Sequence, residues 1–304
     1  MISRRRFLQG LGSLGLVGLA TSAYAGFVEP YLRQRITRYD LKLPRWPAGL
    51  DLTIAVLADL HACKPWMDVE RIESLVEQTN ALGADLIVLL GDYVAGHRFV
   101  SEYLNSGDWS KPLASLKAPL GVHAILGNHD WWEDRATQIA GHGPTIGRLA
   151  LERVGVPVYE NDVVRLKKDG RPFWLAGLGD QLAFWPWRRR YPERRIGVDD
   201  LAGTLGKVQD AAPIILLAHE PDIMPRVPER VSLVLSGHTH GGQIRMFGWS
   251  PVVPSRFRNR YAYGHVHEQC DLIVSGGLGC SIVPVRMGVP PEIVLVSVSG
   301  AQAA

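Results

Sequence analysis

Cysteine is scarce in this chain, and its spacing offers no metal site. Only Cys63, Cys270 and Cys280 occur in 304 residues, and no two of them form a C-x-x-C pair. So few cysteines, in an odd number, exclude a disulfide scaffold and a thiolate zinc site. A single bridge between Cys270 and Cys280 stays open, because an oxidising compartment would allow it.

The chain also has little net charge once its first residues are set aside. The formal charge is +3, and Arg4, Arg5 and Arg6 account for all of it. From Gly26 onward acidic and basic residues balance, so no nucleic-acid partner is expected. Internal repeats and low-complexity tracts are absent, and the composition is that of a folded globular protein.

The first 25 residues have the composition of an export signal. A basic start and a glycine-rich apolar middle precede the small-residue site Ala23-Tyr24-Ala25. The order SRRRFLQ at residues 3–9 resembles the twin-arginine signal, which predicts the twin-arginine export machinery as a partner. The protein is therefore expected in the periplasm or on the outer face of the bacterial cytoplasmic membrane. The apolar segment 7–20 is shorter than the roughly 20 residues of a membrane span. Residues 1–25 are either a cleaved signal or a retained anchor.

The remaining chain divides into a connector and one domain. Residues 26–50 contain three prolines and are expected to form a connector with one short strand near 39–43, ahead of a domain over 51–300. In that domain short apolar runs alternate with helical patterns, as in an α/β fold. Helices are predicted near 68–82 and 146–154, and a hairpin turn is predicted at Asp169-Gly170. The apolar runs predict buried strands, with the sequences LTIAVLA, DLIVLL, GVHAIL, FWLAGLGD, PIILLA, VSLVLS, DLIVS and EIVLVSV.

Polar side chains directly follow five of these predicted strands. In chain order they are Asp59-Leu60-His61, Gly91-Asp92, Gly127-Asn128-His129-Asp130, His219-Glu220 and Gly237-His238-Thr239-His240. Since ligands of open α/β sheets bind at the carboxyl ends of the strands, these segments are expected to converge. Carboxylates, imidazoles and one carboxamide suit Mn, Fe or Zn. They exceed what one tetrahedral ion needs, which predicts two ions that share a bridging carboxylate, with Asp92 as the natural bridge.

The order D-x-H, G-D, G-N-H-D, H and G-H-x-H resembles the calcineurin-like metallophosphoesterase superfamily, from Asp51 to about Ser299. The resemblance implies an α/β fold, a four-layer α/β/β/α sandwich with the metal site at the carboxyl ends of the strands. It also implies a metal-dependent phosphoric ester hydrolase. The ending SGGLGCSIVPVRMGVPPEIVLV and the GHTHGGQ form are similar to an exported or membrane-associated bacterial branch that includes UDP-2,3-diacylglucosamine pyrophosphatases.

The same resemblance implies a role for each site residue. One metal would be held by Asp59, His61, Asp92 and His240, and the other by Asp92, Asn128, His219 and His238. His129 would lie beside the scissile phosphate and stabilise or protonate the leaving oxygen, with Asp130 as a candidate to orient it.

The function indicated is hydrolysis of a phosphodiester or pyrophosphate bond in a lipid-linked or nucleotide-linked substrate. A lipid A precursor is the most specific version, although such precursors are made on the cytoplasmic side and export argues against them. The alternative is a general extracytoplasmic phosphodiesterase or phosphatase acting on soluble esters or wall polymers. A metal-binding interaction module without turnover is the rival from another class, and the complete ligand set disfavours it.

Other notable residues have simpler interpretations. His123 is interpreted as a core residue, and His265 and His267 as solvent-facing. The segment FWPWRRRYPERR at 184–195 interleaves aromatic rings with five arginines. It is either a solvated surface loop or a peripheral contact with anionic membrane.

Overall fold

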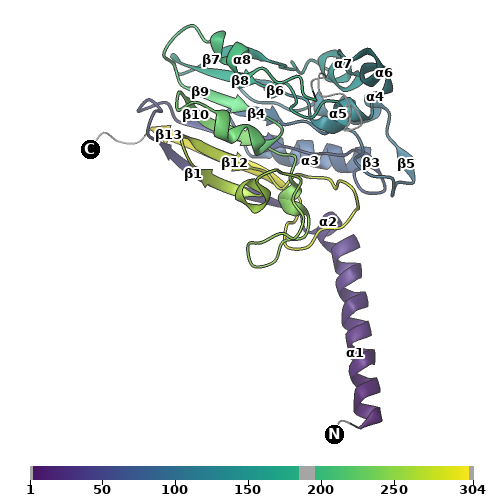
Figure 1. Cartoon of the computed structure of the whole chain (residues 1–304). Coiled ribbons are helices and arrows are strands. Elements are labelled where there is room, and N and C mark those ends of the chain that lie inside the picture. The colour runs from purple at the N-terminus through teal and green to yellow at the C-terminus, as the bar shows by residue number, and fades with distance from the viewer. Residues whose placement is uncertain (1–2, 185–195, 301–304) are drawn as a thin grey trace.

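Two β-sheets packed face to face form the centre of the structure (Figure 1). The computed structural model describes residues 3–184 and 196–300. The five-stranded sheet has the order β1-β13-β2-β4-β6, and the six-stranded sheet has the order β11-β12-β10-β9-β8-β7. The short strands β3 and β5 pair separately.

The strands and helices alternate along the chain as the α/β rhythm predicts. The five-stranded sheet contains β1 (Arg35–Leu43), β2 (Leu52–Leu57), β4 (Leu86–Leu89), β6 (Val122–Ala124) and β13 (Glu292–Gly300). The six-stranded sheet contains β7 (Asp162–Lys168), β8 (Arg171–Gly177), β9 (Ile214–Leu217), β10 (Val231–Ser236), β11 (Gly264–His267) and β12 (Asp271–Val274). The separate pair is β3 (Cys63–Lys64) and β5 (Glu102–Tyr103).

The helices lie outside the two sheets. The α-helices of the domain are α3 (Val69–Ala81), α4 (Ser106–Leu113), α5 (Asn128–Trp132), α6 (Arg135–Ala140), α7 (Ile146–Arg153) and α8 (Leu201–Gly206). Short 3₁₀ helices are η3 (Pro221–Arg226), η4 (His240–Gly242) and η5 (Arg258–Tyr261). The N-terminal segment forms α1 (Arg4–Ala23), the π-helical turn η1 (Tyr24–Val28) and α2 (Glu29–Leu32).

Three hydrophobic clusters confirm the predicted four-layer sandwich. One lies between the sheets and joins residues such as Ile54 of β2 to Leu175 of β8 and Leu235 of β10. The second packs the other face of the five-stranded sheet against α3, α4 and α7, and the third packs the six-stranded sheet against α8 and η3. Because both faces of each sheet are covered, the central strands are continuous apolar runs rather than alternating ones.

Local sequence signals set the boundaries of the predicted elements. The carboxylate of Asp68 accepts a hydrogen bond from the N–H of Arg71 at 2.9 Å and caps the start of α3. The hairpin between β7 and β8 turns at Asp169 and Gly170, both with positive φ, as a two-residue turn of this kind requires.

The connector contributes more to the sheet than its sequence predicts. The predicted strand near 39–43 is the second half of β1, which begins at Arg35 and pairs with β13 along its whole length. Most of β1 is exposed on one face, and only Leu41 and Leu43 are buried. A half-exposed edge strand lacks the continuous apolar run that reveals a central strand.

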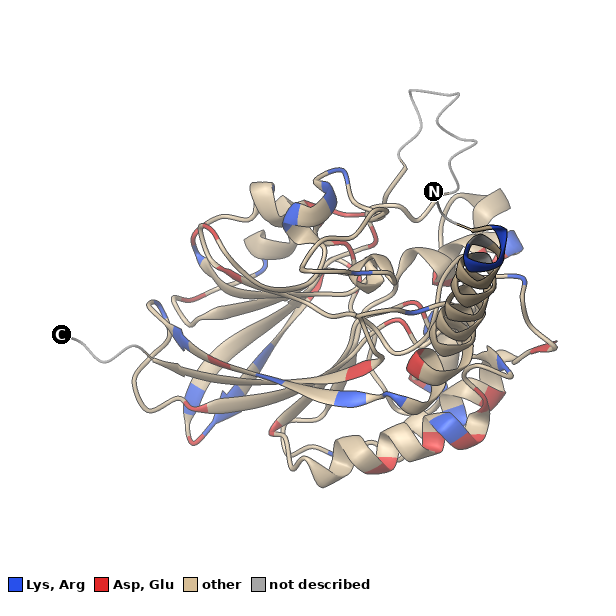
Figure 2. Cartoon of the chain, turned by 90° about the horizontal axis from the view of Figure 1, so that it is seen from below, with Lys and Arg blue, Asp and Glu red and all other residues tan. Residues whose placement is uncertain are grey.

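The N-terminal helix is longer than the apolar run 7–20 suggests. Helical structure continues from Arg4 to Leu32, a 29-residue segment long and apolar enough to cross a membrane. At 1.5 Å per residue it spans about 43 Å. It projects from the body of the molecule, with Arg4, Arg5 and Arg6 at its free end (Figures 1 and 2). The predicted cleavage site, 23–25, lies inside this helical segment.

The remaining residues singled out in the sequence are placed as follows. His123 is buried and bonds Tyr159 and the carbonyl of Leu120, whereas His265 and His267 are exposed. The cysteines are buried free thiols, so the structure holds no Cys270–Cys280 bridge. Apart from Phe184, which is buried, the segment 184–195 lies outside the described residues.

Candidate metal centre

The side chains predicted to bind metal come together at one end of the sandwich. Asp59 and His61 follow β2, Asp92 follows β4, and His219 follows β9, while Asn128 opens α5 after β6 and His238 and His240 follow β10. Two clusters form, in each of which the candidate ligand atoms lie within 4.8 Å of one another. The clusters are Asp59, His61 and His240, and Asp92, His219 and His238.

Asp92 lies between the two clusters. Its Oδ2 is 3.2 Å from Nε2 of His219, a member of its own cluster, and 3.6 Å from Nε2 of His61 in the other. Its Oδ1 accepts a hydrogen bond from the backbone N–H of His129 at 2.8 Å. One carboxylate oxygen therefore faces both groups of ligands, while the other fixes the carboxylate to the loop after β6.

The backbone at the site adopts conformations that are rare elsewhere. Five of the predicted ligands have φ between 47° and 68°, in the left-handed region: Asp59, His61, Asp92, His238 and His240. A residue with a side chain pays about 1–3 kcal/mol for such a conformation, and it persists only where the surrounding structure imposes it. Clustering of this strain on the converging loops is typical of a functional site.

Two glycines allow the loops after β4 and β6 to approach each other. A Cβ at Gly91, which has φ +93°, would lie 2.3 Å from the backbone nitrogen of Gly127. A Cβ at Gly127 would lie 2.4 Å from Oδ1 of Asp92. These glycines are therefore required for Asp92 and Asn128 to reach the same site.

Hydrogen bonds to backbone carbonyls orient two of the imidazoles. Nδ1 of His61 lies 2.9 Å from the carbonyl oxygen of Val94, and Nδ1 of His219 lies 2.6 Å from that of Leu90. A neutral imidazole that donates from Nδ1 has a lone pair on Nε2. Both Nε2 atoms face the carboxylate of Asp92. Burial lowers the pKa of His61 to about 3, so its Nε2 presents a lone pair. Burial alone would lower the pKa of His219, but the Asp92 carboxylate raises it well above its ordinary value, and a metal ion would take the place of the proton on its Nε2.

The contacts of His238 also direct a ring nitrogen toward a possible metal ligand. Its Nε2 lies 2.9 Å from the carbonyl oxygen of Pro254, and its Nδ1 lies 2.8 Å from Oδ1 of Asn128. Burial lowers the pKa of His238, so the imidazole is neutral and carries one N–H. If that N–H donates to Pro254, the lone pair of Nδ1 faces the amide oxygen of Asn128, and the two atoms fit a shared cation.

The electrostatics of the centre also fit a metal site. Burial raises the pKa of Asp59 to about 7 and lowers the pKa of His61 to about 3. Burial alone would raise the pKa of Asp92, but the imidazoles of His219, His129 and His61 hold it well below its usual range. Oδ2 of Asp59 and Nε2 of His219 are buried without a hydrogen-bond partner. Buried carboxylates and bare imidazole nitrogens of this kind are characteristic of metal-binding residues.

His129 lies at the edge of this centre. Its Nε2 is 3.3 Å from Oγ of Ser281, and its ring makes edge contacts with those of His61 and Trp132, with centroids 5.0 and 5.1 Å away. Its Nδ1 lies 3.7 Å from a carboxylate oxygen of Glu133.

The structure does not place Asp130 where it could orient the His129 ring. Its carboxylate accepts hydrogen bonds, each of 2.9 Å, from the backbone N–H groups of Asp92, Tyr93 and Gly127. Asp130 stands at the third position of α5, so its side chain turns back toward the start of the helix and braces the loops after β4 and β6. The resemblance implied Asp130 as a candidate to orient His129, whereas the start of α5 directs its carboxylate to backbone N–H groups.

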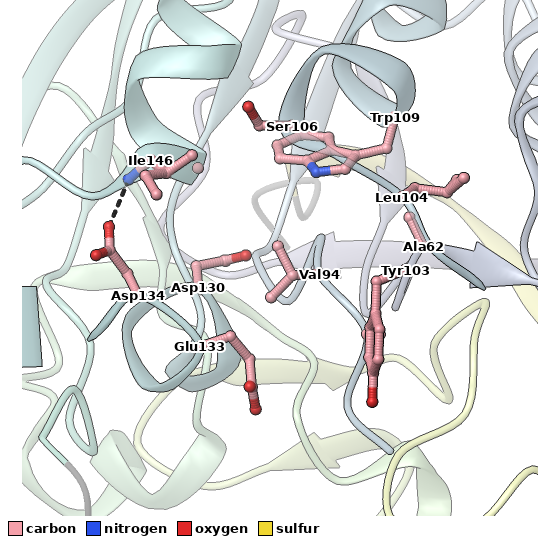
Figure 3. Close-up of a pocket in the computed structure, with 12 residues that line it drawn as sticks. Ala62, Val94, Tyr103, Leu104, Ser106, Trp109, Asp130, Glu133, Asp134 and Ile146 are labelled. Atoms are coloured by element: carbon pink, nitrogen blue, oxygen red, sulfur yellow. Dashed lines mark hydrogen bonds between the residues drawn. The ribbon is translucent and has the colours of Figure 1, made fainter. Parts of the chain in front are cut away.

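Successive residues of α5 line two different cavities. His129 and Asn128 line a cavity of about 490 Å³ at the metal centre, whose other walls are mainly apolar, with Trp132, Ile244, Val252, Ile282 and Val283. Asp130 and Glu133 line a separate cavity of about 370 Å³, together with Val94, Tyr103 and Trp109 (Figure 3). The predicted metal ligands open only onto the first of these two.

Three residues beside the centre received no role from the sequence, although Glu220 belongs to one of the five polar segments. Asp180 and Glu220 are buried next to His219, and burial and the Glu220 carboxylate raise the pKa of Asp180 well above its usual range. Asp180 stands just beyond β8, so the rule that identified the other ligands could have found it. Arg286 is fully buried, with Nη2 3.1 Å from Nδ1 of His240, and a lone arginine in a loop gave no signal.

Comparisons with known proteins found a family profile and several relatives that match this chain in sequence. A family profile described as calcineurin-like phosphoesterase matches residues 52–242, more than half of the chain and all of the predicted ligands. The chain is 29% identical over 300 residues to the uncharacterized metallophosphoesterase YkuE of Bacillus subtilis, with 96% of each chain covered. It is 29% identical over 313 residues to the phosphodiesterase YaeI of Escherichia coli, covering 97% of this chain and 98% of that protein. A Danio rerio relative, named a transmembrane protein with metallophosphoesterase domain, is 26% identical over 291 residues that cover 92% of this chain and 61% of that protein.

Replacing Asp92 by Ala should reduce the metal content of both clusters, because Asp92 is the carboxylate that faces both. Metal per chain, measured by plasma emission, is expected to fall and hydrolysis to disappear. His265→Ala removes an exposed imidazole from another strand and should leave both unchanged. Full metal content with near-normal turnover in Asp92→Ala would contradict the bridging position.

Replacing Asp130 by Ala should destabilise the fold, because three backbone N–H groups would lose their acceptor. Each buried donor left unsatisfied costs about 1–3 kcal/mol, so urea unfolding should show a loss of at least about 2 kcal/mol. An unchanged urea midpoint combined with reduced turnover would restore the orienting role that the sequence suggested.

Proposed function

This chain belongs to the calcineurin-like phosphoesterase family, and we propose that it hydrolyses a phosphodiester or pyrophosphate bond at a centre that holds two metal ions. That the chain is a metal-dependent phosphoester hydrolase follows from the family and from relatives that include a phosphodiesterase. The observation that carries the two-ion proposal is the position of Asp92, with one oxygen facing both ligand clusters.

The proposed ligands divide into two sets that share Asp92. The first set is Asp59, His61, Asp92 and His240, and the second is Asp92, Asn128, His219 and His238. Two bound ions would lower the pKa of a water molecule and neutralise the negative oxygens of the phosphate, while that water attacks the phosphorus and the ester oxygen leaves. No covalent protein nucleophile is then required, and the ions would be Mn, Fe or Zn.

His129 is proposed to hold the proton that the leaving oxygen receives. Burial alone would lower the pKa of His129, but the carboxylates of Asp92 and Glu133 raise it above its ordinary value. The raised pKa favours the protonated imidazole, and the ring lines the cavity of the metal centre. Its backbone N–H, bonded to Oδ1 of Asp92, fixes its position relative to the proposed bridging carboxylate.

The N-terminal helix is proposed to remain attached as a membrane anchor. The N–H of Arg286 donates to the carbonyl of Ala25 at 2.9 Å, and Nη2 of Arg71 donates to that of Pro30 at 2.6 Å. Residues on both sides of the predicted cleavage site are thus part of the folded body, which favours a retained anchor. The arginines at positions 4–6 favour a cytoplasmic N-terminus and a domain on the outer face, reached through the twin-arginine machinery.

The proposed substrate carries a lipid. A UDP-2,3-diacylglucosamine-like molecule is the most specific form of that proposal, but a domain on the outer face argues against it because such precursors are made on the cytoplasmic side. The apolar walls of the cavity at the metal centre support a lipid-linked substrate over a small soluble one. Soluble esters or wall polymers remain the alternative substrates. Assays of the full-length protein with Mn, Fe and Zn distinguish the two substrate classes when a simple diester, a monoester and a UDP-linked lipid are compared. Absence of hydrolysis with every ester would contradict the phosphoesterase proposal.

Replacing His129 by Ala should leave metal content unchanged while turnover of a simple phosphodiester falls by roughly 100-fold or more, as for a lost acid-base group. The ring contributes to no ligand cluster of the described residues, so the metals should stay. Loss of metal in this variant would make His129 a ligand instead.

The membrane fraction should contain the chain at the full-length mass of 33.5 kDa. Cleavage after Ala25 would remove the carbonyl that Arg286 binds. Intact-mass spectrometry of the purified protein checks this, and a mature form that begins at Gly26 would show that the helix is a transient signal.

A further inference from the structure

Two loops beside the metal centre expose large apolar side chains to solvent. We define the apolar rim as the exposed residues Met246, Phe247, Trp249, Val252, Ile282 and Val283, together with the half-buried Ile244. Four of them lie on the cavity wall, and Met246, Phe247 and Trp249 lie on the turn next to it. Contiguous exposed apolar side chains mark a surface that another apolar phase covers.

Phe247 stands at the tip of a hydrogen-bonded turn. The backbones of Met246 and Trp249 pair with N–O distances of 2.9 and 3.0 Å, which leaves Phe247 and Gly248 as the two turn residues. Phe247 has φ +51° and is completely exposed. Left-handed backbone is an outlier for a bulky aromatic residue, and no packing within the fold offsets it. Because Phe247 is strained and fully exposed, we expect it to make a contact outside this chain.

The two loops of the rim are fixed to each other. Nε2 of Gln243 donates to the carbonyls of Val283 and Val285 at 2.9 and 3.1 Å, and its Oε1 accepts from the N–H of Ser281 at 2.6 Å. The N–H of Arg245 donates to the carbonyl of Met287 at 2.7 Å. These hydrogen bonds fix the two loops of the rim relative to each other. The rim is continuous with the cavity that His129 lines.

The anchor helix is attached to the same loop. Arg286, three residues beyond Val283, donates its N–H to Ala25 at the base of the helix. In Figure 1 α1 leaves the body beside α2, on the side where the loops that follow β10 and β12 project. The membrane that would hold α1 thus lies against the rim.

The charge of the rim loops matches an anionic membrane. No Asp or Glu occurs from Arg230 to His267 or from Leu272 to Pro291, whereas arginines stand at positions 245, 256, 258 and 260 of the first stretch. Arg256 and Arg260 pair with Asp222 and Glu268, which leaves Arg245 and Arg258 as the two of these arginines without a carboxylate partner among the described residues. Arginine beside exposed tryptophan suits the headgroup layer of a bilayer that contains anionic lipid.

From these observations we infer that the apolar rim inserts into the outer leaflet that holds α1, so that the metal centre opens to the lipid headgroups. The substrate class is a bilayer-resident phosphoester lipid whose phosphate reaches His129 and whose chain lies along Ile244, Val252 and Ile282. This inference rests on the proposed phosphoesterase function for its substrate, but not for the insertion itself.

Insertion is tested with a fluorescent label at the tip of the turn. The native cysteines are buried, so Phe247→Cys in the full chain can be labelled with an environment-sensitive NBD probe. In vesicles of phosphatidylcholine and phosphatidylglycerol, emission should shift to the blue and be quenched by lipids with a shallow nitroxide. Ile139→Cys, an exposed apolar position on α6, is the matched control and should show neither effect. A label at 247 that behaves like the label at 139 would overturn the insertion.

The substrate class is tested with two chromogenic diesters, methyl p-nitrophenyl phosphate in solution and hexadecyl p-nitrophenyl phosphate in the same vesicles. The double variant Phe247→Asn, Trp249→Ser should keep the first activity and lose roughly tenfold or more of the second, equivalent to about 1.4 kcal/mol of interfacial binding. Asparagine tolerates left-handed backbone, so the turn should stay folded.

The outcomes separate the two proposals. Equal losses on both diesters, or no loss on either, would overturn the assignment of a bilayer-resident substrate while the phosphoesterase function stands. If the metal-loaded parent hydrolyses neither diester, the proposed function fails, and the NBD result still decides whether the rim inserts.

Discussion

The buried carboxylate of Asp92, held between imidazoles of two ligand clusters, is the interaction on which the rest of the site depends. A carboxylate in this position is removed from water and needs cationic partners in a fixed arrangement. The backbone N–H of His129 fixes one oxygen, and the imidazoles of His61 and His219 surround the other. Metal binding and the placement of the proposed proton donor therefore have the same structural origin.

The sandwich supplies the rigidity that this arrangement requires. Five ligand residues in left-handed backbone store several kcal/mol at about 1–3 kcal/mol each. The inter-sheet cluster, with Ile54, Leu175 and Leu235 fully or almost fully out of solvent, holds the strand ends in place against that strain. Asp130 acts at the same junction, since its carboxylate joins the loops after β4 and β6 through backbone N–H groups.

Patterns along the chain predict the fold and most of the centre, because both follow from local rules. Central strands are continuous apolar runs, and parallel strands bring whatever follows them to one edge, so Asp59 and His240 are predicted to meet although they lie far apart in sequence. Such rules do not reveal β1, whose half-exposed face lacks an apolar run, or Arg286, whose role depends on a tertiary contact with His240. The contacts of Asp130 with the loops after β4 and β6 were not predicted, because a place in a motif says little about side-chain direction at the start of a helix. Asp180 obeys the rule of the strand ends, and only its position beside His219 shows that it belongs to the site.

Arg286 connects the proposed anchor with the metal centre through atoms of a single residue. Its backbone N–H binds Ala25 at the base of the helix, and its guanidinium binds the carbonyls of Gly279 and Val289 and lies against His240. A buried guanidinium is retained only where its donors are satisfied, so the loop around it has little freedom to move. The base of the helical segment is thereby tied to the loop that carries Ile282 and Val283. A membrane that held α1 as proposed would meet the protein at this loop. The proposed anchor would then do more than keep the enzyme near the bilayer, since it would also determine which face of the catalytic domain the lipid headgroups reach.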